Sequence, residues 1–545
     1  MLRKTPIWQV ILFLLASISA FGVLAALVFL LITTDAPANG GTYTEAIAGS
    51  PQSLNPLVAA FNEPDRDLTS LLFSGLTKLR KDGAIQPDLA ESWQVSEDGK
   101  SYTFLMRRDA EWHDGRPVSA DDAVYTYQTL ASRDLPTDPE IIALWSQVKP
   151  ERQDQATLRL SMAQPFSPFL SYTTVGLAPN HIYQGINPKD LTANGPNIVG
   201  SGMFRLKQAS MDQVVLEANP KAYSGRPRLD TLDFRFFRDD AAVAAALVNG
   251  NVDGALLYPT TGKEAMDRIA SLKDMTVRYL PRANYSVLFL NSGNPIFQNK
   301  LVRKALSAGI NRDELVTNIA GGFGRAADNP IPIDSWAFNS NAPSARFDPT
   351  EAAKLLDEAG WKTGATAVRE KDGQSLRFSL LTNNDKVRVS TAEDIARQYK
   401  RLGVQVDVQA SGITGLMQNF LIPRKYDAIL FGMDPGYDPD PYPYWHSTQT
   451  STDGLNVAAY TNPEMDTLLG RARTAGSIEE RKQLYARFQE LFAEEVPSVV
   501  LYHPLYAYAM NGRVKGVDTG PLYDTSSRFG NVKDWYLLTQ RVVGS

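Results

Sequence analysis

An uncharged, apolar run near the N-terminus determines on which side of a membrane the rest of this chain can fold. Residues 7–32 carry no charged side chain and follow Arg3 and Lys4. A helix of this length rises by about 39 Å, enough to cross a hydrocarbon core of about 30 Å. Because basic residues flank its start, the N-terminus is expected in the cytoplasm and the remainder outside. We therefore predict an uncleaved signal anchor, a transmembrane helix, over residues 1–34.

A cleaved secretory signal is the alternative. Ala36, Pro37 and Ala38 place small residues where signal cleavage requires them, although the apolar core of such a signal is usually only about 7–15 residues long. Both alternatives place the rest of the chain outside the cytoplasm, either anchored to the membrane or secreted. Residues 35–41, D-A-P-A-N-G-G, have the composition of a flexible linker.

Composition excludes several classes of protein. The length of 545 residues predicts two or three domains. The chain has no cysteine, which excludes disulfides, thiolate nucleophiles and cysteine-ligated metal sites. Its formal net charge is −5, so the sequence lacks the basic excess expected of a nucleic-acid-binding protein. We predict no cofactor.

His113 and Asp114 lie in the stretch E-W-H-D-G-R-P-V-S-A-D-D-A-V (111–124) and allow two interpretations. A histidine beside a carboxylate is typical of general bases and metal ligands. Catalysis would also need a nucleophile or metal partner, and none lies nearby in the sequence. The same residues suit a tight turn, followed by a helix with Ser119 as its N-cap. The structural interpretation is the one that we favour.

Strand-like and helix-like segments alternate along the exported part of the chain. The patterns of 276–280, 286–291 and 426–432 predict short strands. Asp348 and Ser477 each suit the N-cap of an amphipathic helix. This mixture predicts an α/β fold.

Four ordered segments resemble the bacterial family 5 extracellular solute-binding proteins, the peptide, nickel and opine receptors of ABC importers. They are the stretch at 111–124, I-V-G-S-G-M-F-R-L-K (198–207), N-P-K-A-Y-S-G-R-P-R-L-D (219–230) and the segment 288–316. Met203 stands where the family usually has proline. The resemblance covers almost the whole exported chain.

The resemblance implies an α/β clamshell of two lobes that enclose a ligand, with an extra subdomain on one lobe. The expected first lobe combines residues 42–85, 200–300 and 500–545. The inserted subdomain is expected at 86–199 and the second lobe at 301–499. The His113 motif falls in the insert, where the family uses it as a structural element.

The best binding candidate is the loop F-G-M-D-P-G-Y-D-P-D-P-Y-P-Y-W-H-S (431–447). Carboxylates can pair with a ligand ammonium group, and aromatic faces can line a pocket. In peptide-binding relatives, an aspartate just after the strand that we expect at 426–432 holds the N-terminal amine of the peptide. The match falls best on Asp434, with Asp438 one register step away; Tyr437 and Asp440 are further candidates. A rigid proline-rich loop with turn-forming aspartates is the alternative.

Four other side chains are weaker candidates. Trp336 matches a family loop that faces the cleft, Trp445 could line the pocket, and Tyr285 precedes a strand. A packing role is the alternative for both tryptophans. His446 lies near a histidine that some relatives use for nickel complexes, but a lone histidine is weak support for a metal site.

The sequence therefore predicts a monomeric receptor that captures an oligopeptide by lobe closure and delivers it to permease subunits of an ABC importer. A receptor for a nickel complex, an opine or an oligosaccharide is the alternative within the family. An exported hydrolase that uses His113 and Asp114 is the alternative from another class.

Overall fold

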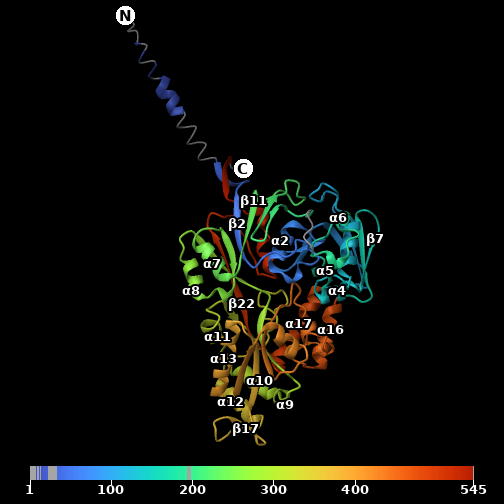
Figure 1. The fold of residues 1–545 in the computed structure, drawn as a ribbon, viewed down its shortest axis with the longest axis vertical. Coiled ribbons are helices and arrows are strands. Elements are labelled where there is room, and N and C mark those ends of the chain that lie inside the picture. Colours follow the sequence, from blue (N-terminus) through green and yellow to red (C-terminus); the bar gives the residue numbers. More distant parts are fainter. Residues whose placement is uncertain are drawn as a thin grey trace.

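One mixed β-sheet runs through both halves of the molecule (Figure 1). The structure is a computed structural model, and it describes residues 6, 8, 11–12, 14–21, 33–192 and 198–543. Among these residues the sheet has twelve strands in the order β20-β19-β21-β14-β22-β12-β2-β11-β10-β9, with β13 and β15 also paired to β22. Their bounds are β2 (Thr42–Ala48), β9 (Phe204–Ala209), β10 (Gln213–Ala218), β11 (Thr231–Phe237), β12 (Gly254–Leu257), β13 (Met275–Pro281), β14 (Tyr285–Leu290), β15 (Gly324–Ala326), β19 (Arg377–Asn383), β20 (Gln405–Ser411), β21 (Ala428–Met433) and β22 (Ser498–Asn511).

Strand β22 belongs to both halves. Its C-terminal part pairs with β12 and β13, in what we call the first half, and its N-terminal part pairs with β14 and β15, in the second half. The pairing partner changes between Tyr502 and Leu505. The chain crosses between the halves a second time at 281–285, between β13 and β14. These two crossings lie next to each other because β13 and β14 both pair with β22.

Helices cover the sheet in both halves (Figure 1). The first half has α2 (Glu63–Leu72), α7 (Asp240–Val248) and α8 (Lys263–Ala270); the second has α10 (Lys300–Ala308), α11 (Arg312–Asn318), α12 (Pro349–Glu358), α13 (Lys386–Arg401), α16 (Pro463–Thr474) and α17 (Ile478–Glu495). The sequence predicted two of their starts, because Asp348 and Ser477 accept hydrogen bonds from the first-turn amides of α12 and α17.

Strand β14 lies in the second half, whereas we expected residues up to 300 in the first lobe. All six of its residues are buried, and it hydrogen-bonds to β21 on one side and β22 on the other. A strand that is apolar on both faces is stable only in the middle of a covered sheet. The change from one half to the other therefore falls at 281–285, and not at 300.

A separate four-stranded antiparallel sheet lies within residues 86–199, which we call the inserted segment. Its order is β5-β6-β8-β7, with bounds β5 (Ala90–Val95), β6 (Ser101–Met106), β7 (Val148–Arg152) and β8 (Thr157–Met162), and it is packed by α3 (Ala120–Leu130) and α4 (Pro139–Trp145). Trp145 stacks on Tyr127 with ring centroids 4.1 Å apart. The apolar core of this sheet is continuous with that of the first half.

His113 holds the inserted segment against the chain that leaves it. Its backbone N–H donates to the carbonyl oxygen of Gly200 (2.8 Å), its Nδ1 accepts from the Gly200 N–H (3.2 Å), and its Nε2 donates to the carbonyl oxygen of Gly202 (3.1 Å). A Cβ atom at position 200 would lie 1.8 Å from the Leu72 carbonyl oxygen, so only glycine fits there. Asp114 pairs with His181 instead (2.8 Å). Each partner of His113 is therefore backbone, and its role is structural.

The expected linker at 35–41 is partly a strand. Strand β1 (Thr33–Ala38) pairs antiparallel with β23 (Leu538–Val543) near the C-terminus, and Arg541 forms an ion pair with Asp35 (3.1 Å). A partner strand distant in sequence satisfies the backbone here, which local composition does not reveal. Most of the apolar run at 7–32 lies outside the described residues. Within the part that is described, no helix is both long and apolar enough to cross a membrane.

We predict that His113 makes folding stability depend on pH. Burial lowers the pKa of His113 to about 4, whereas an unfolded histidine titrates near about 6.5. Between these values the unfolded chain binds the proton and the folded protein does not, so stability falls as the pH drops, by up to about 3 kcal/mol. Urea unfolding of His113→Gln from pH 7 to pH 4 should lack this loss. His181→Gln is the control and should keep it; an unchanged pH dependence in His113→Gln would refute the assignment.

Candidate functional site

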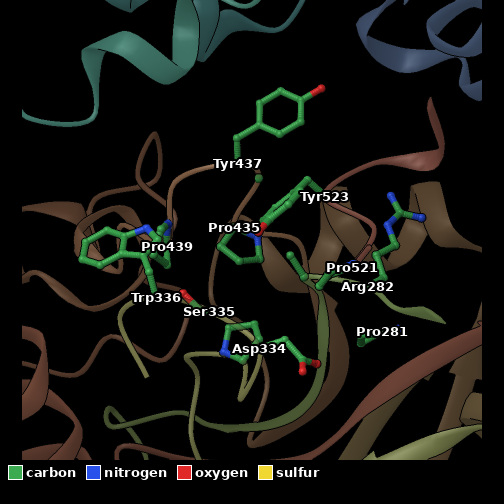
Figure 2. A pocket seen from close by; sticks show the side chains of 13 residues that line it. Pro281, Arg282, Asp334, Ser335, Trp336, Pro435, Tyr437, Pro439, Pro521 and Tyr523 are labelled. Carbon is green, nitrogen blue, oxygen red and sulfur yellow. The ribbon is translucent and has the colours of Figure 1, made fainter. Parts of the chain in front are cut away.

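A hollow lies between the two halves, next to the crossings. Its volume is about 430 Å³, counting the part that opens to solvent, and its lining comes from four segments, within 281–283, 332–336, 435–439 and 521–523. In Figure 2 Trp336 and Pro439 lie on one side of the hollow, opposite Tyr523 and Arg282. Prolines and aromatic rings make up most of the wall, and Arg282 and Asp334 are its charged groups. Such a lining is typical of a small-molecule site.

The loop that follows β21 is held rigidly at this hollow. Asp434 Oδ1 accepts the N–H of Gly436 (3.2 Å), which closes an Asx-type turn. Gly436 has φ +75°, a conformation that glycine adopts without strain. The hydroxyl of Tyr444 donates to the Asp434 carbonyl oxygen (3.1 Å). The position of the Asp434 carboxylate is therefore set before any ligand arrives.

Arg282 links Asp434 to the first half of the molecule. Its Nη2 donates to Asp434 Oδ2 (2.9 Å) and its Nη1 to Glu63 Oε1 (3.1 Å), while its guanidinium lies 5.5 Å from the centroid of the Tyr506 ring. Burial alone would lower the pKa of Arg282, but Tyr506, Asp434 and Glu63 together raise it, so the guanidinium stays charged. The Arg282 side chain is 10% exposed and that of Asp434 is 43% exposed. Asp434 is thus the solvent-facing member of the group.

Asp438 and Asp440 are engaged within the second half. Asp438 accepts two hydrogen bonds from Arg481 (2.5 and 2.8 Å), whose guanidinium lies under the Trp336 ring. Asp440 is buried and accepts from Arg473 Nε (2.7 Å). Burial raises the pKa of Asp440, and the charge of Arg473 opposes this rise. Both carboxylates stabilise the loop by their ion pairs with arginines of the second half.

Tyr437 and Trp336 line the hollow. The Tyr437 hydroxyl donates to Asp524 in the first half, so this loop joins the two halves directly. The Trp336 ring packs 5.9 Å from that of Tyr485. Both aromatic side chains therefore combine a packing contact with an exposed face at the hollow.

Tyr285 and Trp445 lie behind the loop. They are 2% and 0% exposed, and they border a second, smaller hollow of about 220 Å³ that shares Pro435 and Pro439 with the first. Trp445 packs against Phe289 and Phe492 in the core of the second half. Neither side chain lines the first hollow, so any effect on a ligand would act through the prolines.

His446 is occupied by local contacts. Its ring stacks on Tyr442 with centroids 4.0 Å apart, and its Nδ1 accepts the N–H of Thr448 (3.1 Å). Burial lowers its pKa. In the described part of the chain, no three His, Asp or Glu side chains gather in a way that could hold a metal ion.

Sequence reasoning missed Arg282, Asp334 and Tyr523. Arg282 lies just before the buried strand β14, and that contrast in polarity was the one available signal. Tyr523 comes from the C-terminal segment, which meets the 435–439 segment only through the fold. No local sequence pattern marks a tertiary contact between segments that are this far apart in the chain.

The chain is similar to known proteins over nearly its whole length. The sequence profile of the bacterial extracellular solute-binding proteins, family 5, matches residues 84–455. The oligopeptide-binding protein AppA of Bacillus subtilis is 29% identical, over 92% of each chain, and the dipeptide-binding protein of Escherichia coli is 26% identical, over 90% of this chain and 94% of its own.

Two solved structures show the same fold. The structure of AppA from Bacillus subtilis in complex with a nonapeptide has a TM-score of 0.73 at 27% identity and covers 92% of this chain and all of its own. NikZ from Campylobacter jejuni in complex with Ni(L-His) has a TM-score of 0.74 at 26% identity, over 91% of this chain and 99% of its own.

We predict that Asp438 and Asp434 differ in their effect on stability. Asp438→Asn leaves the buried Arg481 guanidinium without its counter-charge and should lower the free energy of unfolding by about 3–5 kcal/mol. Asp434→Asn should cost about 1 kcal/mol or less, because Arg282 keeps Glu63. Urea unfolding at pH 7 measures both, and equal stabilities would refute the distinction.

Proposed function

This chain belongs to the bacterial extracellular solute-binding proteins of family 5, and we propose that it captures short peptides outside the cytoplasm and presents them to permease subunits of an ABC importer. Members of this family are binding receptors and not enzymes, so the chain is not the hydrolase that we weighed on His113 and Asp114. The backbone contacts of His113 agree with that conclusion.

The proposal rests on the fixed position and the solvent exposure of the Asp434 carboxylate. It is preset by the turn at Gly436 and faces solvent beside the hollow. Its ionic partner Arg282 also binds a second carboxylate, Glu63. If a ligand ammonium replaces Arg282 on Asp434, Glu63 continues to neutralise the guanidinium. A peptide N-terminus is such an ammonium, and the proline and aromatic walls accept varied side chains.

Ligand capture proceeds by closure of the two halves. Contacts such as Tyr437 to Asp524 join the halves in the present conformation and must break when the cleft opens. A ligand that contacts both halves favours the closed form by its difference in affinity for the two forms. The hollow between the halves has the proline and aromatic lining that such a ligand would contact.

The N-terminal run fits a tether to the membrane. An anchor at 1–34 keeps a monomeric receptor near its permease and raises its effective concentration there. The pairing of β1 with β23 begins at Thr33, directly after the apolar run at 7–32. A cleaved signal ending near Ala38 would cut the chain at the end of β1 and release a secreted receptor, so the length of the mature N-terminus decides between the two.

Native mass spectrometry of the gently purified protein should show a bound mass that fits a short peptide. A nickel complex, an opine or an oligosaccharide would give a different mass and would direct the function to one of the other family ligands.

We predict that Asp434→Ala lowers the affinity for peptides with a free N-terminus by tenfold or more, a loss of about 1.4 kcal/mol or more. Calorimetric titration with the peptide found by mass spectrometry measures this loss. The N-acetylated form of that peptide is the control, because it lacks the charge and should bind the parent and Asp434→Ala equally weakly. Unchanged affinity of Asp434→Ala for the free peptide would exclude this residue as the amine anchor.

A further inference from the structure

The inserted segment reaches across to the second half at a place separate from the two chain crossings. After β8, the loop at 163–168 lies against the C-terminal end of α16. The Ser167 N–H donates to the carbonyl oxygen of Arg473 (2.7 Å), and the Ser167 hydroxyl donates to that of Ala475 (2.5 Å). The last carbonyl groups of a helix have no partner within the helix, so Ser167 satisfies two acceptors that would otherwise require water.

The Arg473 side chain, which belongs to the second half, adds a further contact with the inserted segment. Its guanidinium lies 5.4 Å from the centroid of the Phe166 ring and 3.9 Å from that of the Tyr442 ring. Its Nε donates to the buried Asp440. Arg473 is thus held between an aromatic ring of the inserted segment and the loop that borders the hollow.

The same loop connects this contact to the candidate ligand site. Asp440 lies directly after Pro439, which lines both hollows. The backbone N–H of Tyr442 also donates to Asp440 (3.1 Å), so the chain from Pro439 to Tyr442 moves as one unit with Arg473. A shift of the loop at the hollow therefore shifts the guanidinium that lies on Phe166.

We propose that Phe166, Ser167 and Arg473 form a latch through which the inserted segment holds the cleft closed, with Arg473 as a positioning residue that couples the ligand-bordering loop to the latch. The proposal rests on the proposed function, since it requires that the halves open and close. The two crossings are covalent and persist when the cleft opens. The Ser167 hydrogen bonds join the inserted segment to α16 without any covalent link, so they exist in the closed form alone.

The chemistry of the latch suits a contact that forms and breaks. It consists of two hydrogen bonds to backbone carbonyls and one cation–π contact, and the groups on both sides can bind water when separated. A typical hydrogen bond of this kind changes an equilibrium by about two- to tenfold. The latch is strong enough to bias closure and weak enough to let the cleft open.

The test measures the closed fraction by single-molecule energy transfer. The chain has no cysteine, so dyes attach only at Glu97→Cys in the inserted segment and Lys482→Cys on α17, both exposed positions. Ser167→Ala should lower the ratio of closed to open molecules by about two- to tenfold without ligand. It should speed dissociation of a bound pool of di- to pentapeptides by a similar factor while the association rate stays nearly constant. Arg473→Gln should have a larger effect on both quantities.

Arg471→Gln is the matched control, because Arg471 lies on the same helix, is 62% exposed and pairs only loosely with Glu480 (3.6 Å). It should behave as the parent protein. If Arg473→Gln fails to fold, Ser167→Ala decides alone, since it removes a single hydroxyl. Parent-like closed fractions in Ser167→Ala and Arg473→Gln would overturn the latch. If peptides leave the closed fraction of the parent protein unchanged, the proposed function is refuted instead. The closed fractions measured without ligand still test the latch in that case.

Discussion

Strand β22 joins the two halves of the molecule. It is a single strand of 14 residues that hydrogen-bonds to strands of both halves. Because β13 and β14 pair with its two parts, the crossing at 281–285 lies beside the change of partners between Tyr502 and Leu505. Opening of the cleft therefore has to bend the chain at these adjacent points. The hollow, with Arg282 in its wall, lies at the same place.

Ion pairs around the loop after β21 divide its carboxylates by role. Asp438 and Asp440 each face an arginine of the second half, and both pairs are mostly buried. Those pairs keep the proline-rich loop in one conformation, which lowers the entropy that a ligand has to remove on binding. The Asp434 side chain is 43% exposed instead, and its arginine is shared with Glu63 of the first half. One loop thus contains two carboxylates that stabilise it and a third, Asp434, that we propose for recognition.

Local sequence patterns predicted helix starts and strands well, but they predicted contacts between distant segments of the chain poorly. The N-caps at Ser477 and Asp348 and the strand at 276–280 depend on neighbouring residues, so the sequence was sufficient for them. The family resemblance is confirmed by the profile match and by relatives aligned over nine-tenths of the chain. The placement of β14, the pairing of β1 with β23 and the Arg282 to Asp434 contact all join segments that are far apart in sequence. Burial and hydrogen bonding across the whole fold determine such contacts, and residue types within a short window do not record them.

We propose that the cleft beside β22 closes over a peptide whose ammonium group pairs with Asp434. A crystal structure of the protein with the peptide that co-purifies with it tests this most directly. The ligand nitrogen should lie about 2.7–3.2 Å from an Asp434 oxygen, with Arg282 still bound to Glu63 and both halves in contact with the ligand. A peptide bound elsewhere, or one whose N-terminus faces solvent while Arg282 stays on Asp434, would contradict it.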